Sequence, residues 1–255
     1  MKTIELETFF KTLLKPELFD DYCPNGLQIE GRDEIKKVVF AVSATRESAE
    51  YAAKVKADAL IVHHGVFWKF HGTRTLTGPF ARRVFPLIKN DINLFGYHLP
   101  LDGHIDVGNA ASVAKLIGLS HLAPFGNYKG VATGIMGEFS SPLQAIEVKK
   151  LLEEKLSHSI LYSNPTETDG IIKKIGIITG GANSEWREAK KLGLDAYITG
   201  EMSEHDYHES RESGVHMFAG GHHATEKFGI QALMSLVQKE FPSLECQFLD
   251  SQNPA

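Results

Sequence analysis

Apolar and polar stretches alternate along the chain in a way that predicts strands followed by helices. The apolar run "KVVFAVSA" precedes "TRESAEYAAKVKA", residues 45–57, which has helical spacing and a capping residue at its start. Two further runs of strand length, "DALIVHHG" and "INLFGYH", are separated by a loop rich in Gly and Thr and by a predicted helix over about 79–90. This order predicts an α/β fold with mixed, mostly parallel sheets flanked by helices.

The flanking segments add less regular elements. The N-terminal "MKTIELETFFKTLL" predicts an amphipathic helix, whereas "DYCPNGLQIEG" carries the Pro, Asn and Gly of a loop. Beyond the third strand the pattern predicts a helix starting near Asp106, a strand at "ATGIMGEF" and a helix over about 142–155.

The second half of the chain repeats the first. "VVFAVSA" begins at Val38 and the matching "KIGIITGG" places Ile175 at the same point of its strand, while "DALIVHHG" and "DAYITGEM" match from Asp58 and Asp195, the same offset (195 − 58 = 137). A helix of similar length lies between the strands of each pair. We therefore expect a duplicated, two-lobed α/β protein, with a first lobe over residues 1–125 and 222–255 and a second over 126–221.

Composition excludes some classes of protein. The hydrophobic content of 42% is enough for an ordinary globular core, and the net charge of -5 disfavours nucleic acid as a partner. No apolar run approaches the roughly 18 residues that span a membrane. With only two cysteines and no CxxC pair, a disulfide framework is not expected, and the sequence predicts a cytoplasmic protein.

Polar side chains of the metal-ligand type follow the predicted strands at their ends. His63 and His64 end the second strand, His98 ends the third, and Asp102 follows four residues later. In the second half the corresponding positions hold Glu201, His205 and His222. Because ligands of parallel α/β sheets bind beyond the carboxyl ends of the strands, these clusters predict one shared site.

Each cluster has a simpler alternative. His63 and His64 face opposite ways in a regular strand, so they serve one metal only if the chain turns there; otherwise they face two ions, or one is a core histidine and the other is exposed. Asp102, followed by Gly, could be a turn residue.

The segment "GGHHATEKFG" favours the metal interpretation. His222 and Glu226 are four residues apart and share one face of a helix, and the Glu226 carboxylate offers two oxygens with which to bridge two cations. Three imidazoles and two carboxylates suit a pair of divalent transition ions, namely Zn, Mn, Fe, Co or Ni. The predicted metal ligands are His63, His64, Asp102, His222 and Glu226.

Five segments, in this order, resemble the GTP cyclohydrolase 1 type 2 family, also called the NGG-interacting-factor-three-like family of dinuclear-metal proteins: "NGLQIEG", "VHHGVFW", "GYHLPLD", "ITGEMSEHD" and "GGHHATEKFG". The resemblance implies a duplicated two-lobed fold, a toroidal homohexamer, and two metal ions per subunit held by the same five residues. The chain resembles the compact, bacterial-type form, which has no additional domain between the lobes.

The resemblance also implies hydrolytic opening of the guanine imidazole ring of GTP. The expected substrate is therefore a small molecule, a nucleotide. Alternatives are a metal-dependent phosphoesterase and a non-catalytic metal-binding scaffold or interaction protein. In the hydrolase, Glu226 helps to activate water, and His98, Glu201 and His205 are candidates for proton transfer, although each could instead orient a ligand.

The segment after the histidine pair offers a clue to the substrate. Lys69, His71 and Arg74 are cations of the kind that a phosphorylated nucleotide requires, and Trp68 and Phe67 could stack on a base, although core packing is the default for both. Arg82 and Arg83 are expected to face solvent on a helix, without a role.

Overall fold

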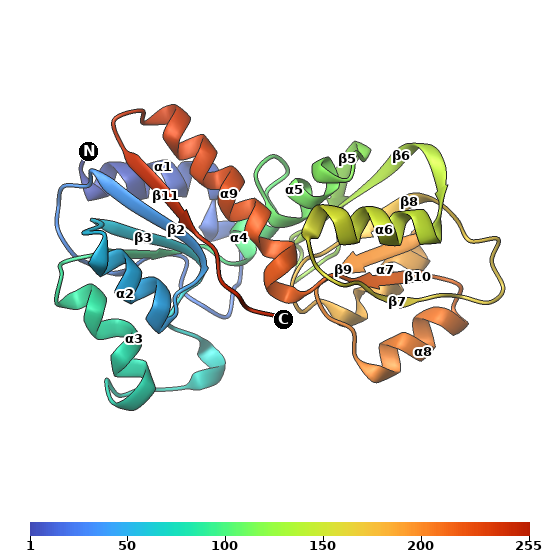
Figure 1. Cartoon of the computed structure of the whole chain (residues 1–255), viewed down its shortest axis with the longest axis horizontal. Coiled ribbons are helices and arrows are strands. Elements are labelled where there is room, and N and C mark those ends of the chain that lie inside the picture. Colours follow the sequence, from blue (N-terminus) through green and yellow to red (C-terminus); the bar gives the residue numbers. More distant parts are fainter. The chain divides into compact units, whose positions relative to one another are not determined.

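The computed structural model describes all 255 residues, which form two compact units (Figure 1). Unit 1 comprises Met1–Leu101 and Ile230–Ser251, and unit 2 comprises Asp102–Gly229 and Gln252–Ala255. The last helix, α9 (His222–Glu240), begins in unit 2 and belongs to unit 1 from Ile230 onward. None of the helices is both long and apolar enough to span a membrane.

Unit 1 is built on a five-stranded sheet with the order β1-β4-β3-β2-β11. Three of its four strand pairs are parallel, and only β1 runs antiparallel to its neighbour β4. Its strands are β1 (Gly26–Ile29), β2 (Lys37–Ser43), β3 (Ala59–His64), β4 (Asn93–Gly96) and β11 (Glu245–Leu249). Its helices are α1 (Thr3–Leu14), η1 (Pro16–Leu18), α2 (Arg46–Lys54), η2 (Lys69–His71), α3 (Gly78–Ile88) and α4 (Leu99–Asp102), the last of which ends on the first residue of unit 2.

Helices cover both faces of this sheet, as Figure 1 shows. Val39 and Leu60 pack against Ala49 of α2 and Val84 of α3 on one face. On the other face, Phe10 of α1 lies with its ring 6.3 Å from that of Phe95. The central strands are therefore buried on both sides, which explains why their sequences are continuous apolar runs without alternation.

Unit 2 is built on a six-stranded sheet with the order β5-β6-β8-β9-β10-β7. The parallel trio β8, β9 and β10 is flanked by antiparallel neighbours on both sides. Its strands are β5 (Ser120–Phe125), β6 (Gly134–Gln144), β7 (Leu161–Ser163), β8 (Ile171–Ile177), β9 (Ala196–Thr199) and β10 (His216–Ala219). Helices α5 (Asn109–Leu116) and α6 (Ala145–Leu156) pack on one face and α7 (Trp186–Lys191), preceded by η3 (Asn183–Glu185), packs on the other, while α8 (Glu204–Glu212) follows β9.

The duplication is confirmed down to single hydrogen bonds. Val38 pairs with Ala59 across β2 and β3, and Ile175 pairs with Ala196 across β8 and β9, so both partners keep the 137-residue offset. The Asp58 carboxylate accepts from the backbone N–H groups of Lys36 and Lys37, and the Asp195 carboxylate accepts from those of Lys173 and Lys174. Each aspartate thus ties the start of one strand to the next, in both units.

The limits of the units differ from the predicted limits of the lobes. Residues 102–125 and 222–229 pack in unit 2, whereas the sequence placed them with the first lobe. The reason is pairing between neighbouring elements, because β5 forms an antiparallel pair with β6 and α5 packs on that same sheet. The segment expected to be a loop at 21–31 also contains β1, a short edge strand with a register irregularity.

Candidate metal centre

Three imidazoles come together in unit 1. His63 and His64 are the last residues of β3, and His98 follows β4, the neighbouring parallel strand. The ring centroid of His63 lies 4.5 Å from that of His64 and 5.1 Å from that of His98. One ring nitrogen of each of the three lies within 4.8 Å of the others, so the three side chains could contact the same metal site.

Each of these imidazoles uses its Nδ1 for a hydrogen bond with the protein. His63 Nδ1 lies 2.9 Å from the carbonyl oxygen of Tyr97, and since a carbonyl only accepts, Nδ1 carries the proton and Nε2 carries the lone pair. His64 Nδ1 is paired with Ser43 Oγ at 3.0 Å. Hydrogen bonds of this kind fix the ring orientation of metal-binding histidines and raise their basicity.

The partner of His98 is Asp21, which the sequence interpretation missed. The buried Asp21 carboxylate accepts from His98 Nδ1 at 2.9 Å, from the Leu99 N–H at 3.0 Å and from the Asn25 amide at 2.9 Å. Burial alone would raise the pKa of Asp21, but the hydrogen bond and charge of His98, with the Asn25 and Leu99 contacts, outweigh it and lower that pKa to about 2. Asp21 is therefore an anion that holds His98 in place.

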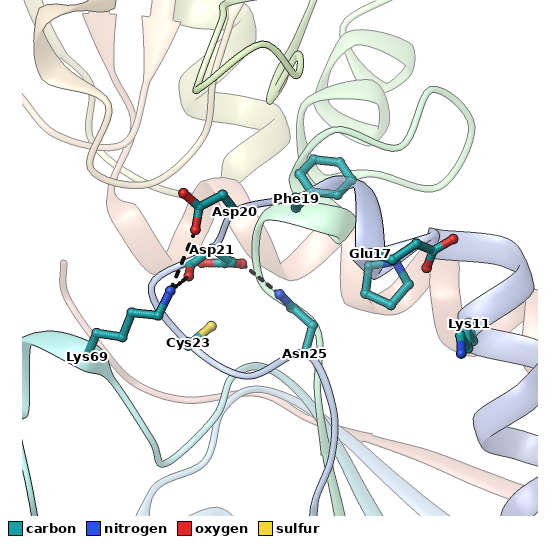
Figure 2. A pocket seen from close by; sticks show the side chains of 9 residues that line it. Lys11, Glu17, Phe19, Asp20, Asp21, Cys23, Asn25 and Lys69 are labelled. Atoms are coloured by element: carbon teal, nitrogen blue, oxygen red, sulfur yellow. Dashed lines mark hydrogen bonds and ion pairs between the residues drawn. The ribbon is translucent and has the colours of Figure 1, made fainter.

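Asp21 also borders a cavity of about 310 Å³ on the surface of unit 1. Figure 2 shows the Lys69 ammonium directed at Asp20 and at the backbone oxygen of Asp21, with the Asn25 amide on the other side of the carboxylate. The loop that carries Asp21 is thereby joined to the segment that follows the histidine pair.

In unit 2, Asp102, His222 and Glu226 form a second group. Helix α9 begins at His222, so Glu226 lies one turn later on the same face, with its Oε1 3.3 Å from His222 Nε2. A carboxylate oxygen of the buried Asp102 lies within 4.8 Å of one from Glu226, which is also buried. Asp102 is therefore part of a cluster of ligand atoms rather than an exposed turn residue.

The groups around these side chains again orient them. Asp102 Oδ1 accepts from Asn109 Nδ2 at 2.8 Å and from Thr179 Oγ1 at 3.3 Å. No motif or spacing in the sequence indicates that Asn109 and Thr179 belong to the site. Glu201 Oε1 lies 2.5 Å from His222 Nδ1. Glu201, one of the candidates for proton transfer, thus orients the predicted metal ligand His222.

The two carboxylates change the protonation of His222. Burial favours its neutral form, but hydrogen bonds to Glu226 and Glu201 and their negative charge outweigh burial and raise the pKa of His222 to about 9. His205, by contrast, lies on the exposed side of α8, with its Nε2 3.5 Å from Asp206 Oδ2, and does not contact His222, Asp102 or Glu226. The structure does not bring His205 into this group.

A glycine keeps the space beside Glu226 clear. Gly180 has φ +67°, and a Cβ built on it would lie 2.3 Å from Glu226 Oε1 and 3.0 Å from His222 Nε2. The two groups described above consist of imidazoles and carboxylates, a donor set that fits divalent transition ions. In unit 1, Cys23 also lies near them, because its Sγ, a carboxylate oxygen of Asp21 and a ring nitrogen of His98 lie within 4.8 Å of one another. The residues present therefore fit a metal site whose ligands are clustered His, Asp and Glu side chains.

Replacing Gly180 by Ala tests this space. We expect metal affinity to fall about tenfold or more, because the added methyl displaces two ligand side chains. Gly193→Ala is the matched control, since Gly193 has φ +66° and no atom within 4 Å of its built Cβ. Both variants bear the left-handed strain of roughly 1–2 kcal/mol. Equal metal affinities for the two, measured by competition with a chelator, would contradict the interpretation.

Comparison with known proteins identifies relatives over the whole length. The family model Duf34/NIF3 (NGG1p interacting factor 3) matches residues 1–254. The chain is 41% identical to a GTP cyclohydrolase 1 type 2 homolog of Haemophilus influenzae and 38% identical to one of Escherichia coli, covering 100% of both chains in each case.

Solved structures agree with the sequence relatives. The protein ybgI, described as of unknown function, has a TM-score of 0.90 at 38% identity, and TTHA1606 of Thermus thermophilus has 0.90 at 29%, each with 100% of both chains covered. The match of fold, length and sequence shows that the chain belongs to the Duf34/NIF3 (NGG1p interacting factor 3) family.

Proposed function

We propose that the protein is a dinuclear-metal-dependent hydrolase that opens the guanine imidazole ring of GTP or of a related nucleotide. In this proposal His63, His64, Asp102, His222 and Glu226 hold two divalent ions. The observation that carries the proposal is the group of three imidazoles in unit 1, with ring nitrogens within 4.8 Å of one another. Such a convergence of histidines is costly for a structural core and suited to metal chemistry. The relatives named as GTP cyclohydrolase 1 type 2 homologs favour GTP as the first substrate to test.

Two bound divalent ions would supply a water of lowered pKa, nucleophilic near neutral pH. Ring opening would add one water across the C8=N7 bond, with the oxygen on C8 and one proton on N7. The C8–N9 bond would then break, C8 would become a formyl carbon, and the second proton would be delivered to N9. The chain must position the ligands and move that proton. Tyr97 and Ser43 orient His63 and His64, and Glu201 orients His222.

We assign the proton transfer to His98. It is the one proton-transfer candidate whose ring lies among the other imidazoles of unit 1, 5.1 Å from His63 and 5.8 Å from His64 between centroids. Asp21 holds its Nδ1 proton, which leaves Nε2 as the nitrogen that exchanges a proton with substrate. The homohexamer and the cytoplasmic location remain predictions from the sequence.

The experiment is incubation of metal-loaded protein with GTP, followed by mass spectrometry and by an assay of inorganic phosphate. Ring opening gives a product heavier by one water with the triphosphate intact, and it requires the ions. Release of phosphate without ring opening would instead support the phosphoesterase. The absence of both reactions with any of the five candidate metals would leave the scaffold role and refute the hydrolase.

A further inference from the structure

A second cavity in unit 1 lies beside the histidine group. It has a volume of about 340 Å³ and is bordered by the segment after β3 together with Pro24. Four of the residues that line it are aromatic or positively charged, namely Phe67, Trp68, Lys69 and Arg74, and the others are Pro24, Gly72 and Thr73, so none is a carboxylate. A net-negative ligand with a planar ring would match this lining.

Trp68 separates this cavity from the imidazoles. Its ring centroid lies 5.1 Å from that of His98, edge to face, and 5.8 Å from that of His64. Its Nε1 donates to the Gly65 carbonyl at 3.2 Å, which fixes the indole. Neither Trp68 nor its neighbour Phe67 is a core residue, because Trp68 is only half-buried and Phe67 is 37% exposed. Both aromatic side chains therefore lie outside the buried core, although the Trp68 ring stacks on that of Phe70, with 5.4 Å between the centroids.

The positive charge at this cavity comes from Arg74. Its guanidinium stacks on the Phe80 ring, 3.9 Å from the centroid, and Nη1 donates to His71 Nδ1 at 3.1 Å. This stacking holds the guanidinium plane in place while its other N–H groups have no protein partner. Lys69 differs, because its ammonium already contacts Asp20 and the Asp21 backbone oxygen.

The guanidinium of Arg74 has no counter-charge nearby. Arg74 forms no salt bridge with a carboxylate of the protein, and no carboxylate lines the cavity. A positive charge without a counter-charge at a cavity attracts a bound anion. On α3, burial and the positive charge of Arg74 lower the pKa of Arg83, which is half-buried, whereas the sequence predicted that it faces solvent.

We propose that Arg74 binds the phosphate groups of a nucleotide whose base stacks on the Trp68 and Phe67 side of the cavity. This inference rests on the proposed function in naming a nucleotide as substrate, and it assigns the side chains that select it. The rigid guanidinium of Arg74 suits bidentate contact with phosphate oxygens, and stacking on an aromatic ring tolerates any base. The site would therefore favour nucleotides over free bases and over small phosphoesters.

The test measures binding of the nucleoside and of the phosphate groups separately, in the absence of metal. Chelator-treated full-length protein is titrated calorimetrically with GTP, guanosine and inorganic triphosphate. We expect Arg74→Ala to weaken GTP and triphosphate about tenfold or more and to leave guanosine unchanged. Trp68→Ala is expected to weaken GTP and guanosine about tenfold and to spare triphosphate. Arg82→Ala, an exposed neighbour on α3, is the control and keeps wild-type affinities.

Three results of the binding titrations would overturn the inference. They are the absence of GTP binding to the wild type, equal weakening by Arg74→Ala and Arg82→Ala, and the same effect of Arg74→Ala on all three ligands. Arg74→Lys, which keeps the charge and loses the fork, is expected to bind GTP between the wild type and Arg74→Ala. Binding without any turnover would support this site and refute the hydrolase, whereas turnover with an unchanged KM in Arg74→Ala would refute this site alone.

Discussion

Replacement of His63 by Ala is expected to remove most of the tightly bound metal and to abolish metal-dependent hydrolysis. His63 is fully buried, and its Nδ1 contact with the Tyr97 carbonyl leaves Nε2 as the ligating nitrogen. Loss of a residue that only orients a ligand lowers metal affinity about 10- to 100-fold. Loss of the ligand itself should exceed that range. The measurement is metal content by mass spectrometry after dialysis, together with the GTP assay.

Two further variants make this result interpretable. Glu226→Gln keeps the volume of the side chain and removes its charge, so it should also lose metal without opening a cavity in the core. His208→Ala removes an exposed histidine of α8 and should keep wild-type metal content and activity. If His63→Ala and Glu226→Gln proteins bound metal as tightly as the His208→Ala protein, the proposed ligand set would be wrong.

The Asp21→Ala variant is expected to be less stable than the wild type by about 3 kcal/mol. The substitution leaves the donors of His98, Leu99 and Asn25 without their acceptor in a buried position, and each such group costs about 1–3 kcal/mol. Urea unfolding is followed by tryptophan fluorescence in proteins that also carry Trp186→Phe, so that the signal comes from Trp68, which contacts His98 in this part of unit 1. Asp20→Ala is the control and should change stability by less than about 0.5 kcal/mol, because Asp20 is exposed.

Removal of the Asp21 charge is also expected to change how stability depends on pH. The pKa of Asp21 is about 2 in the folded protein and 3.8 for an ordinary aspartate, so its ionised form stabilises the fold above about pH 4. That contribution is lost as pH falls from about 4 towards about 2. Asp21→Asn should therefore lose less stability than the wild type over this interval. Parallel curves for the two proteins would show that Asp21 does not carry the charge assigned to it.

Local sequence patterns predicted the long helices and the central strands well and missed the edge strand β1. The predicted helix over about 79–90 is α3, at Gly78–Ile88, and the predicted helix over about 142–155 is α6, at Ala145–Leu156. Strand β1, with four residues, was read as a loop because Pro and Asn precede it and one of its residues is Gly. Its pairing with β4 outweighs that local preference, as is usual for edge strands.

In the candidate site, too, the sequence predicted some residues and missed others. Residue type and position at strand ends were sufficient to nominate His63, His64 and His222, because the carboxyl ends of parallel strands lie at one edge of a sheet. The groups that orient these ligands carry no such signal. Ser43 belongs to an apolar strand, and Asn109 is one of many polar residues at a helix start, so only the folded chain distinguishes them.

The sequence by itself determined the order of strands and helices, the duplication, and the chemical type of the ligands, since each follows from periodicity, spacing or an offset of 137 residues. The tertiary structure decided which side chains meet. His98 and Asp21 are 77 positions apart, and so are Asp102 and Thr179. The physical reason is range: local patterns report neighbours three or four residues apart, whereas these hydrogen bonds and charge contacts join distant parts of the chain.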